Sequence, residues 1–145
     1  MAGIFGTNAV LTTDLNLLVQ IVSFVLVLGA LACKIKGKFK IHGSIMGFAV
    51  LLHFITFLIA MGPSFIGNFT FLTSETLLTG VQTLWIHAIS GAVSLILGIF
   101  LVTMWVPKAY NIKPCFSRKR IMDATAVSWT ISFVFGIVTY IAFYV

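Results

Sequence analysis

Four long stretches of this chain are almost free of charge, and each is long enough to cross a lipid bilayer. They cover residues 15–33, 41–61, 78–106 and 121–145 of the 145 residues. The chain is 60% hydrophobic and only 8% charged, and its mean hydropathy of +1.14 is too high for a soluble domain. We therefore expect an all-α integral membrane protein, folded as a four-transmembrane-helix bundle in a single domain over residues 1–145.

The lysines and arginines fall between the first and second stretches and between the third and fourth. They are Lys34, Lys36, Lys38, Lys40, Lys108, Lys113, Arg118, Lys119 and Arg120. Short loops rich in these residues stay on the cytoplasmic side of the cell membrane. We expect both basic loops in the cytoplasm and both termini outside (N-out and C-out), with Asp14 outside and Tyr140 as an interfacial anchor. Orientation alone accounts for the cations, and no nucleic-acid partner is expected.

Small residues at four-residue spacing predict where the helices approach one another, since lipid gives apolar side chains little reason to prefer a neighbouring helix. The second stretch has a GxxxG pair, and the third and fourth have series of Ser and Gly. In chain order these residues are Gly43 and Gly47; Ser90, Ser94 and Gly98; and Ala124, Ser128, Ser132 and Gly136. We expect the second, third and fourth helices to form the tight core, with the first packed more loosely and facing a partner.

The histidines are the strongest candidates for chemistry, because an ionisable side chain inside a bilayer is costly. His53 in the second stretch and His87 in the third lie at similar depth, to within one helical turn. Two neutral imidazoles that face each other across neighbouring helices could ligate a heme iron axially or share a copper ion. His42, at the membrane boundary after the lysine run, is a third candidate ligand.

A structural alternative applies to each histidine, which could instead form a hydrogen bond with a hydroxyl or a backbone carbonyl of a neighbouring helix. A proton- or quinone-binding role for His53 and His87 also stays open. The sequence contains no P-loop, dinucleotide fingerprint, HExxH motif, nucleophile elbow or paired carboxylates. Catalysis by this chain alone is therefore not expected, and the cofactor is left as one heme, one copper ion or none.

Three segments within residues 40–145 carry a resemblance to a known family. They read His42-Gly43-Ser44-Ile45-Met46-Gly47, then Trp85-Ile86-His87-Ala88, then Val138-Thr139-Tyr140-Ile141-Ala142-Phe143-Tyr144. In these segments the chain resembles small four-helix membrane proteins of unassigned domain type, some of which assist the assembly of heme-copper oxidases. Members usually have a further histidine where the last span begins, and this chain has Ser117-Arg118-Lys119-Arg120 there.

The His42-Gly43 opening and the paired His53 and His87 are also similar to b-type transmembrane cytochromes, which use four axial histidines for two hemes. With 3 histidines, this chain could hold at most one such heme.

Three functions are left: an accessory or assembly subunit of a larger membrane redox complex, a heme- or copper-binding electron-transfer protein, and a component of a small transporter or channel. We favour the first, because it needs no complete active site and uses the small-residue faces and the apolar loop between the second and third stretches as contact surfaces. The complex would be of the oxidase or copper-dependent monooxygenase type, and the partners would be other membrane protein subunits and membrane lipids.

Overall fold

The computed structural model describes residues 4–108 and 118–145, and in this part of the chain 4 helices are long and apolar enough to cross a membrane. They are α1 (Leu11–Ile35), the second span (Phe39–Gly67), α5 (Thr79–Trp105) and α7 (Lys119–Tyr144). The described residues form no strand. The predicted all-helical fold with its four apolar spans is confirmed, and the largest boundary difference is at the end of the second span, predicted at residue 61 and observed at 67.

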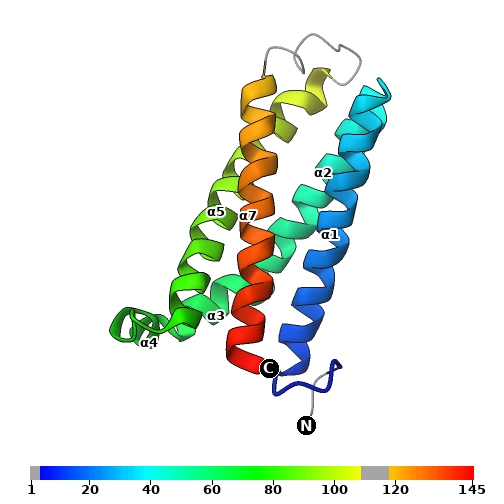
Figure 1. The fold of residues 1–145 in the computed structure, drawn as a ribbon. Coiled ribbons are helices and arrows are strands. Elements are labelled where there is room, and N and C mark those ends of the chain that lie inside the picture. Colours follow the sequence, from blue (N-terminus) through cyan, green and yellow to red (C-terminus); the bar gives the residue numbers. More distant parts are fainter. Residues whose placement is uncertain (1–3, 109–117) are drawn as a thin grey trace.

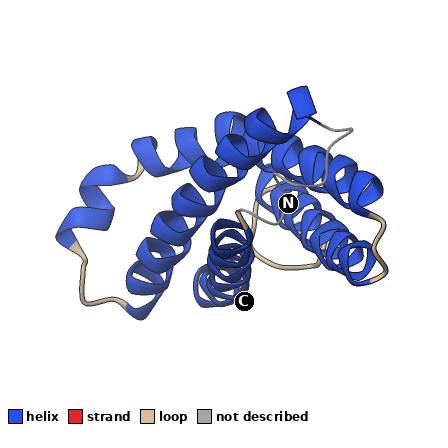
Figure 2. Ribbon diagram, turned by 90° about the horizontal axis from the view of Figure 1, so that it is seen from above, coloured by secondary structure: helices blue, strands red, loops and turns tan. Residues whose placement is uncertain are grey.

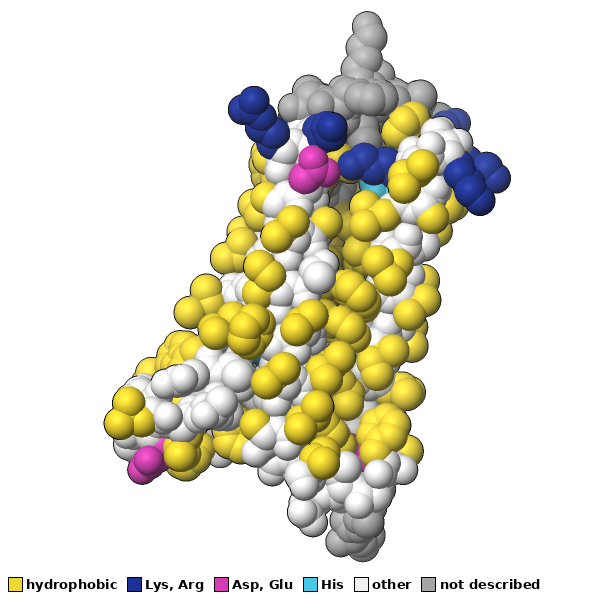
Figure 3. Space-filling model, viewed as in Figure 1, with side chains coloured by type: hydrophobic (Ala, Val, Ile, Leu, Met, Phe, Trp, Pro, Cys, Tyr) yellow, Lys and Arg dark blue, Asp and Glu magenta, His cyan; other side chains and the backbone are white. Residues whose placement is uncertain are grey.

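The chain runs up and down through the bundle, so that the two termini lie together at one end (Figure 1). The lysine and arginine side chains gather at the opposite end, above sides covered mainly by hydrophobic side chains (Figure 3). We refer to these as the terminal end and the basic end. Lys113 of the second basic loop lies outside the described residues. Large apolar side chains such as Ile96, which is 67% exposed, point outward from the long helices, as expected for helices surrounded by lipid.

The most extensive helix pair is α5 with α7, followed by α1 with α2. The prediction that the second, third and fourth spans form the tight core, with the first loosely attached, is wrong, because α1 packs along α2 more extensively than α2 packs on α5. A tight turn at residues 36–38 places α2 beside α1, and two side-chain hydrogen bonds then join the two helices. The His42 ring donates to the carbonyl of Ala30 over 2.8 Å, and the Gln20 amide donates to the hydroxyl of Thr56 over 3.1 Å.

The second span changes geometry before it ends. After α2 (Phe39–Thr56) come a π-helical turn, η1 (Phe57–Met61), and two short helices, α3 (Gly62–Gly67) and α4 (Phe69–Ser74). Pro63 at the start of α3 has no N–H to donate to the preceding turn, which favours an irregular turn there. In both ribbon views α3 and α4 stand to one side of the long helices (Figures 1 and 2). We name residues 57–74 the arm.

The apolar core lies where all four long helices meet. Its buried members come from every one of them: Val27 of α1, Ala49 and Val50 of α2, Leu95 of α5 and Trp129 of α7. Trp129 is the largest of the fully buried side chains among the described residues. This core therefore links the α1–α2 pair to the α5–α7 pair and sets the surroundings of the histidines.

Candidate functional site

His87 lies in α5 and is held against α7. Its Nδ1 donates to the carbonyl oxygen of Ser132 over 2.8 Å and lies 3.2 Å from the Ser132 hydroxyl, which in turn donates to the carbonyl of His87 over 3.1 Å. A Cβ atom on Gly136 would lie 2.9 Å from this same Nδ1. The ring can therefore keep its position only because residue 136 is glycine. His87 therefore joins two helices through backbone hydrogen bonds.

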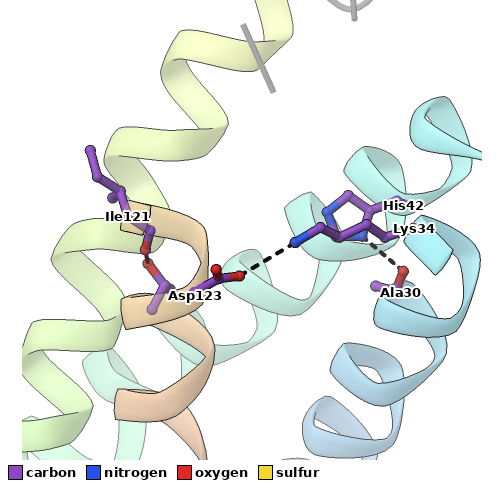
Figure 4. Close-up of polar contacts among 6 residues, drawn as sticks. Ala30, Lys34, His42, Ile121 and Asp123 are labelled. Atoms are coloured by element: carbon purple, nitrogen blue, oxygen red, sulfur yellow. Dashed lines mark hydrogen bonds and ion pairs between the residues drawn. The ribbon is translucent and has the colours of Figure 1, made fainter. Parts of the chain in front are cut away.

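His42 has a comparable place between α1 and α2. Its Nδ1 donates to the carbonyl of Ala30, and the side chain is buried (Figure 4). In front of it, Lys34 of α1 and Asp123 of α7 form an ion pair across the gap between their helices, with 3.5 Å between Nζ and Oδ1 (Figure 4). Both His42 and His87 therefore donate a hydrogen bond to a backbone carbonyl of a neighbouring helix, as the structural alternative to ligand binding predicted.

His53 differs from the other two histidines. Its ring is 2% exposed and packs against Trp129 of α7, with 5.1 Å between ring centroids. It is also close enough to His87 and to the backbone of Gly91 to interact electrostatically with both. The Nδ1 atom of His53 and the Nε1 atom of Trp129 are both buried and have no hydrogen-bond partner among the described residues. His53 thus reaches α5 and α7, near His87, with part of its hydrogen-bonding capacity unmet.

Ser23 of α1 adds a third buried polar group at this height. The Gln20–Thr56 hydrogen bond sets the register of α1 against α2. Because the two helices are antiparallel, Ser23, one turn after Gln20, lies level with His53, one turn before Thr56. The Ser23 hydroxyl is also buried without a partner. A water molecule could satisfy such groups.

The surroundings of His53 and His87 bear on the predicted heme or copper site. Trp129 packs against the His53 ring, and the Nδ1 side of the His87 ring lies against Ser132 and Gly136. A copper site needs further ligands. In the described part of the chain, no three His, Cys, Asp or Glu side chains come together in a way that could hold a metal ion. The described residues therefore show no such ligand set for copper, and a heme held by His53 and His87 stays a prediction.

Ser128, Ser132 and Gly136 of α7 lie against α5, whereas Ala124 is exposed. Ser128 donates to the carbonyl of Ser90 over 2.9 Å, and Ser132 and Gly136 contact His87 as described. A Cβ on Gly91 would come within 2.9 Å of the Ser132 hydroxyl. Gly91, which the small-residue pattern did not include, therefore belongs to this interface.

The small residues of α2 and of the second half of α5 have mixed surroundings. Gly98 lies against Val50 of α2, with 2.9 Å between a built Cβ and Cγ2 of Val50, and Ser94 is fully buried. Gly43 makes room for the indole of Trp105, whereas a Cβ on Gly47 would have no neighbour within 4 Å. The GxxxG pair therefore accommodates one aromatic side chain and leaves Gly47 open.

A buried polar cluster at the terminal end was not anticipated. Asp14 is fully buried rather than free in the external region. Its Oδ1 accepts a hydrogen bond of 2.5 Å from the hydroxyl of Tyr140, which is 9% exposed and also lies 2.7 Å from the hydroxyl of Thr7. The backbone N–H of Phe5 donates to Asp14 Oδ2 over 3.4 Å. The sequence feature that could have indicated this cluster is Asp14, because an acidic residue at the edge of a membrane span needs a polar partner.

A comparison of the chain with protein-family models, with curated protein sequences and with solved structures finds no match. The resemblance to the family linked to oxidase assembly thus stays a prediction, carried by the three sequence segments alone.

Proposed function

We propose that this chain is a non-catalytic accessory or assembly subunit of a larger membrane redox complex of the oxidase or copper-dependent monooxygenase type. It would lie in the cell membrane with the basic end in the cytoplasm and both termini outside, the orientation that retained basic loops favour. The observation that carries the proposal is the arm, an ordered apolar segment that continues the second span beyond α2, extends to one side of the other long helices and leaves much of its surface uncovered.

One side of the arm is attached to α5. The ring of Phe65 makes an edge contact with Trp85, with 5.2 Å between centroids, and the Trp85 indole donates to the carbonyl of Leu72 over 3.3 Å. Other arm side chains are open. Ile59 and Ile66 in the second span are 75% and 76% exposed, and Phe69 and Phe71 of α4, beyond the span, are 51% and 43% exposed. Because these contacts already order the arm, the arm would lose little conformational entropy when a partner subunit binds its open face.

The histidines support a subunit without its own active site. His42 and His87 donate to backbone carbonyls of neighbouring helices, which is a role in assembly of the bundle. The redox nature of the partner rests on the resemblance around these residues, because some members of that family assist oxidase assembly.

The experiment is purification of the tagged full chain from native membranes in mild detergent, followed by mass spectrometry of the bound chains and by absorption spectra. We expect a fixed stoichiometry with subunits that carry heme or copper. Replacing both Ile59 and Ile66 by Ser should release them. The matched control replaces Ile96 and Val127 by Ser. These residues are also exposed but lie on α5 and α7, and the control variant should keep its partner subunits.

A wild-type chain that migrates alone, or an arm variant that retains its partners, would overturn the proposal. So would a b-type heme band or stoichiometric copper in the isolated chain that disappears in the His87→Ala variant, since this would make the chain itself an electron carrier.

A further inference from the structure

A partly open cavity of about 80 Å³ lies at the basic end and is lined by residues of all four long helices. We name it the basic groove. Its walls are mostly apolar side chains: Leu31, Met46, Val50, Leu101, Val102 and Met122. Two cationic side chains, Lys34 and Arg118, also line it. The groove is therefore amphipathic, with an apolar interior and positive charge.

Two glycines bring other side chains into the wall of the groove. The indole of Trp105 lies over Gly43, and Val50 lies against Gly98, and all four residues line the groove. Across the opening, α1 is joined to α7 by the ion pair of Lys34 and Asp123 (Figure 4).

The charge around the groove favours an anionic ligand. Lysine and arginine side chains predominate at the basic end on the face shown in Figure 3. Asp123 is 54% exposed at its side chain and its ion pair with Lys34 is long, so that Lys34 can also bind a second anion. Basic pockets between transmembrane helices are suited to the phosphate of lipid headgroups.

We propose that the basic groove binds one anionic phospholipid from the adjacent leaflet. Lys34 and Arg118 bind its phosphate, and an acyl chain lies along the apolar wall that includes Met46 and Leu101. A free phosphate ion would use the cations and leave the apolar wall exposed, whereas a phospholipid matches both parts of the groove. The inference needs only that the chain lies in a membrane, and it does not depend on the accessory role.

The experiment places the purified full chain in mixed micelles with equal amounts of phosphatidylglycerol and phosphatidylcholine, and native mass spectrometry counts the lipids that stay bound. We expect one phosphatidylglycerol per chain, in preference to phosphatidylcholine. The double variant Lys34→Gln/Arg118→Gln should bind it at least about tenfold more weakly, because two charge-assisted contacts are lost. The matched control is Lys36→Gln/Lys119→Gln, which removes the same charge at residues that do not line the groove and should bind as the wild type does.

A second variant, Leu101→Trp, keeps both cations and fills the apolar wall. It should also lose the phosphatidylglycerol, with circular dichroism to show that the helices are retained. If the Lys36→Gln/Lys119→Gln control lost phosphatidylglycerol to the same extent, net charge alone would attract the lipid, and the proposal would be overturned. Displacement of the lipid by inorganic phosphate at the same concentration would identify a simple anion site and would overturn it as well.

Discussion

The two ends of the bundle are closed in different ways. At the terminal end, Asp14 and Tyr140 are buried together, and the backbone N–H of Asn8 donates to the carbonyl of Tyr144. At the basic end, α1 and α7 are joined by Lys34 and Asp123, whose side chains are 24% and 54% exposed. Between α1 and α7, the terminal end is thus closed by a buried hydrogen bond, whereas the basic end has a partly exposed ion pair beside the basic groove.

The difference follows from where each kind of polar group is stable. A buried hydrogen bond lies in a medium of low dielectric constant, where leaving a partner unsatisfied is costly, so that Asp14 and Tyr140 hold each other in place. The side chains of Lys34 and Arg118 carry full charges that favour water or the headgroup layer, and both line the open groove at this end. The comparison teaches that a buried hydrogen bond joins α1 and α7 more closely than a partly exposed ion pair does.

The largest effect is expected from Tyr140→Phe. This variant leaves the buried carboxylate of Asp14 with the 3.4 Å contact to the N–H of Phe5, and we expect the folding equilibrium constant to fall by about two orders of magnitude. The measurement is unfolding of the protein in mixed micelles by added SDS, followed by circular dichroism.

The control for this prediction is Tyr144→Phe. Its ring lies 5.4 Å from that of Tyr140, centroid to centroid, and we expect a stability close to that of the wild type. If Tyr140→Phe behaved in the same way as Tyr144→Phe, the terminal end would not be held by this hydrogen bond, and the contrast between the two ends would fail.

An intermediate effect is expected from adding a methyl group in the terminal half. In Gly136→Ala the new Cβ would lie 2.9 Å from His87 Nδ1 and would push the ring away from Ser132. We expect a loss of roughly 1–2 kcal/mol in the free energy of unfolding, since overpacking a close contact forces neighbouring groups to move. The SDS titration measures this loss.

The matched substitution in the basic half is Gly47→Ala, where the new Cβ meets nothing within 4 Å. Alanine is the better helix former, and we expect no loss or a gain of up to about 1 kcal/mol. Opposite signs for the two variants would sharpen the comparison. Equal losses would mean that the two halves are packed equally tightly.

The smallest effect is expected from Asp123→Asn. An ion pair with this exposure contributes about 0–1 kcal/mol, so that the free energy of unfolding should change little in the same titration. Retention of phosphatidylglycerol should rise, because a carboxylate near the phosphate is removed. A large loss of stability would instead show that this pair closes the basic end.

The sequence predicted the four membrane-spanning helices better than it predicted which helices pack against each other. Apolar length and charge placed four spans correctly to within a few residues, because both properties act on each segment independently. The small residues did not predict the pairing of α1 with α2, which depends on the hydrogen bonds of His42 and Gln20. The predicted ligand pair at His53 and His87 lies in one region, but the rings face Trp129 and Ser132, and sequence spacing does not define how helices are rotated about their axes.

Local properties of the sequence determined the four apolar spans and the separation of the basic residues from the termini. Transfer of each segment into lipid and retention of each charge in water do not require knowledge of neighbouring helices. Tertiary structure alone decided that Asp14 meets Tyr140 across 126 residues, that the arm leaves the bundle and that a groove opens beside Lys34. The physical reason is that lipid does not favour one apolar helix face over another, so that close packing and a few hydrogen bonds select the arrangement of the helices.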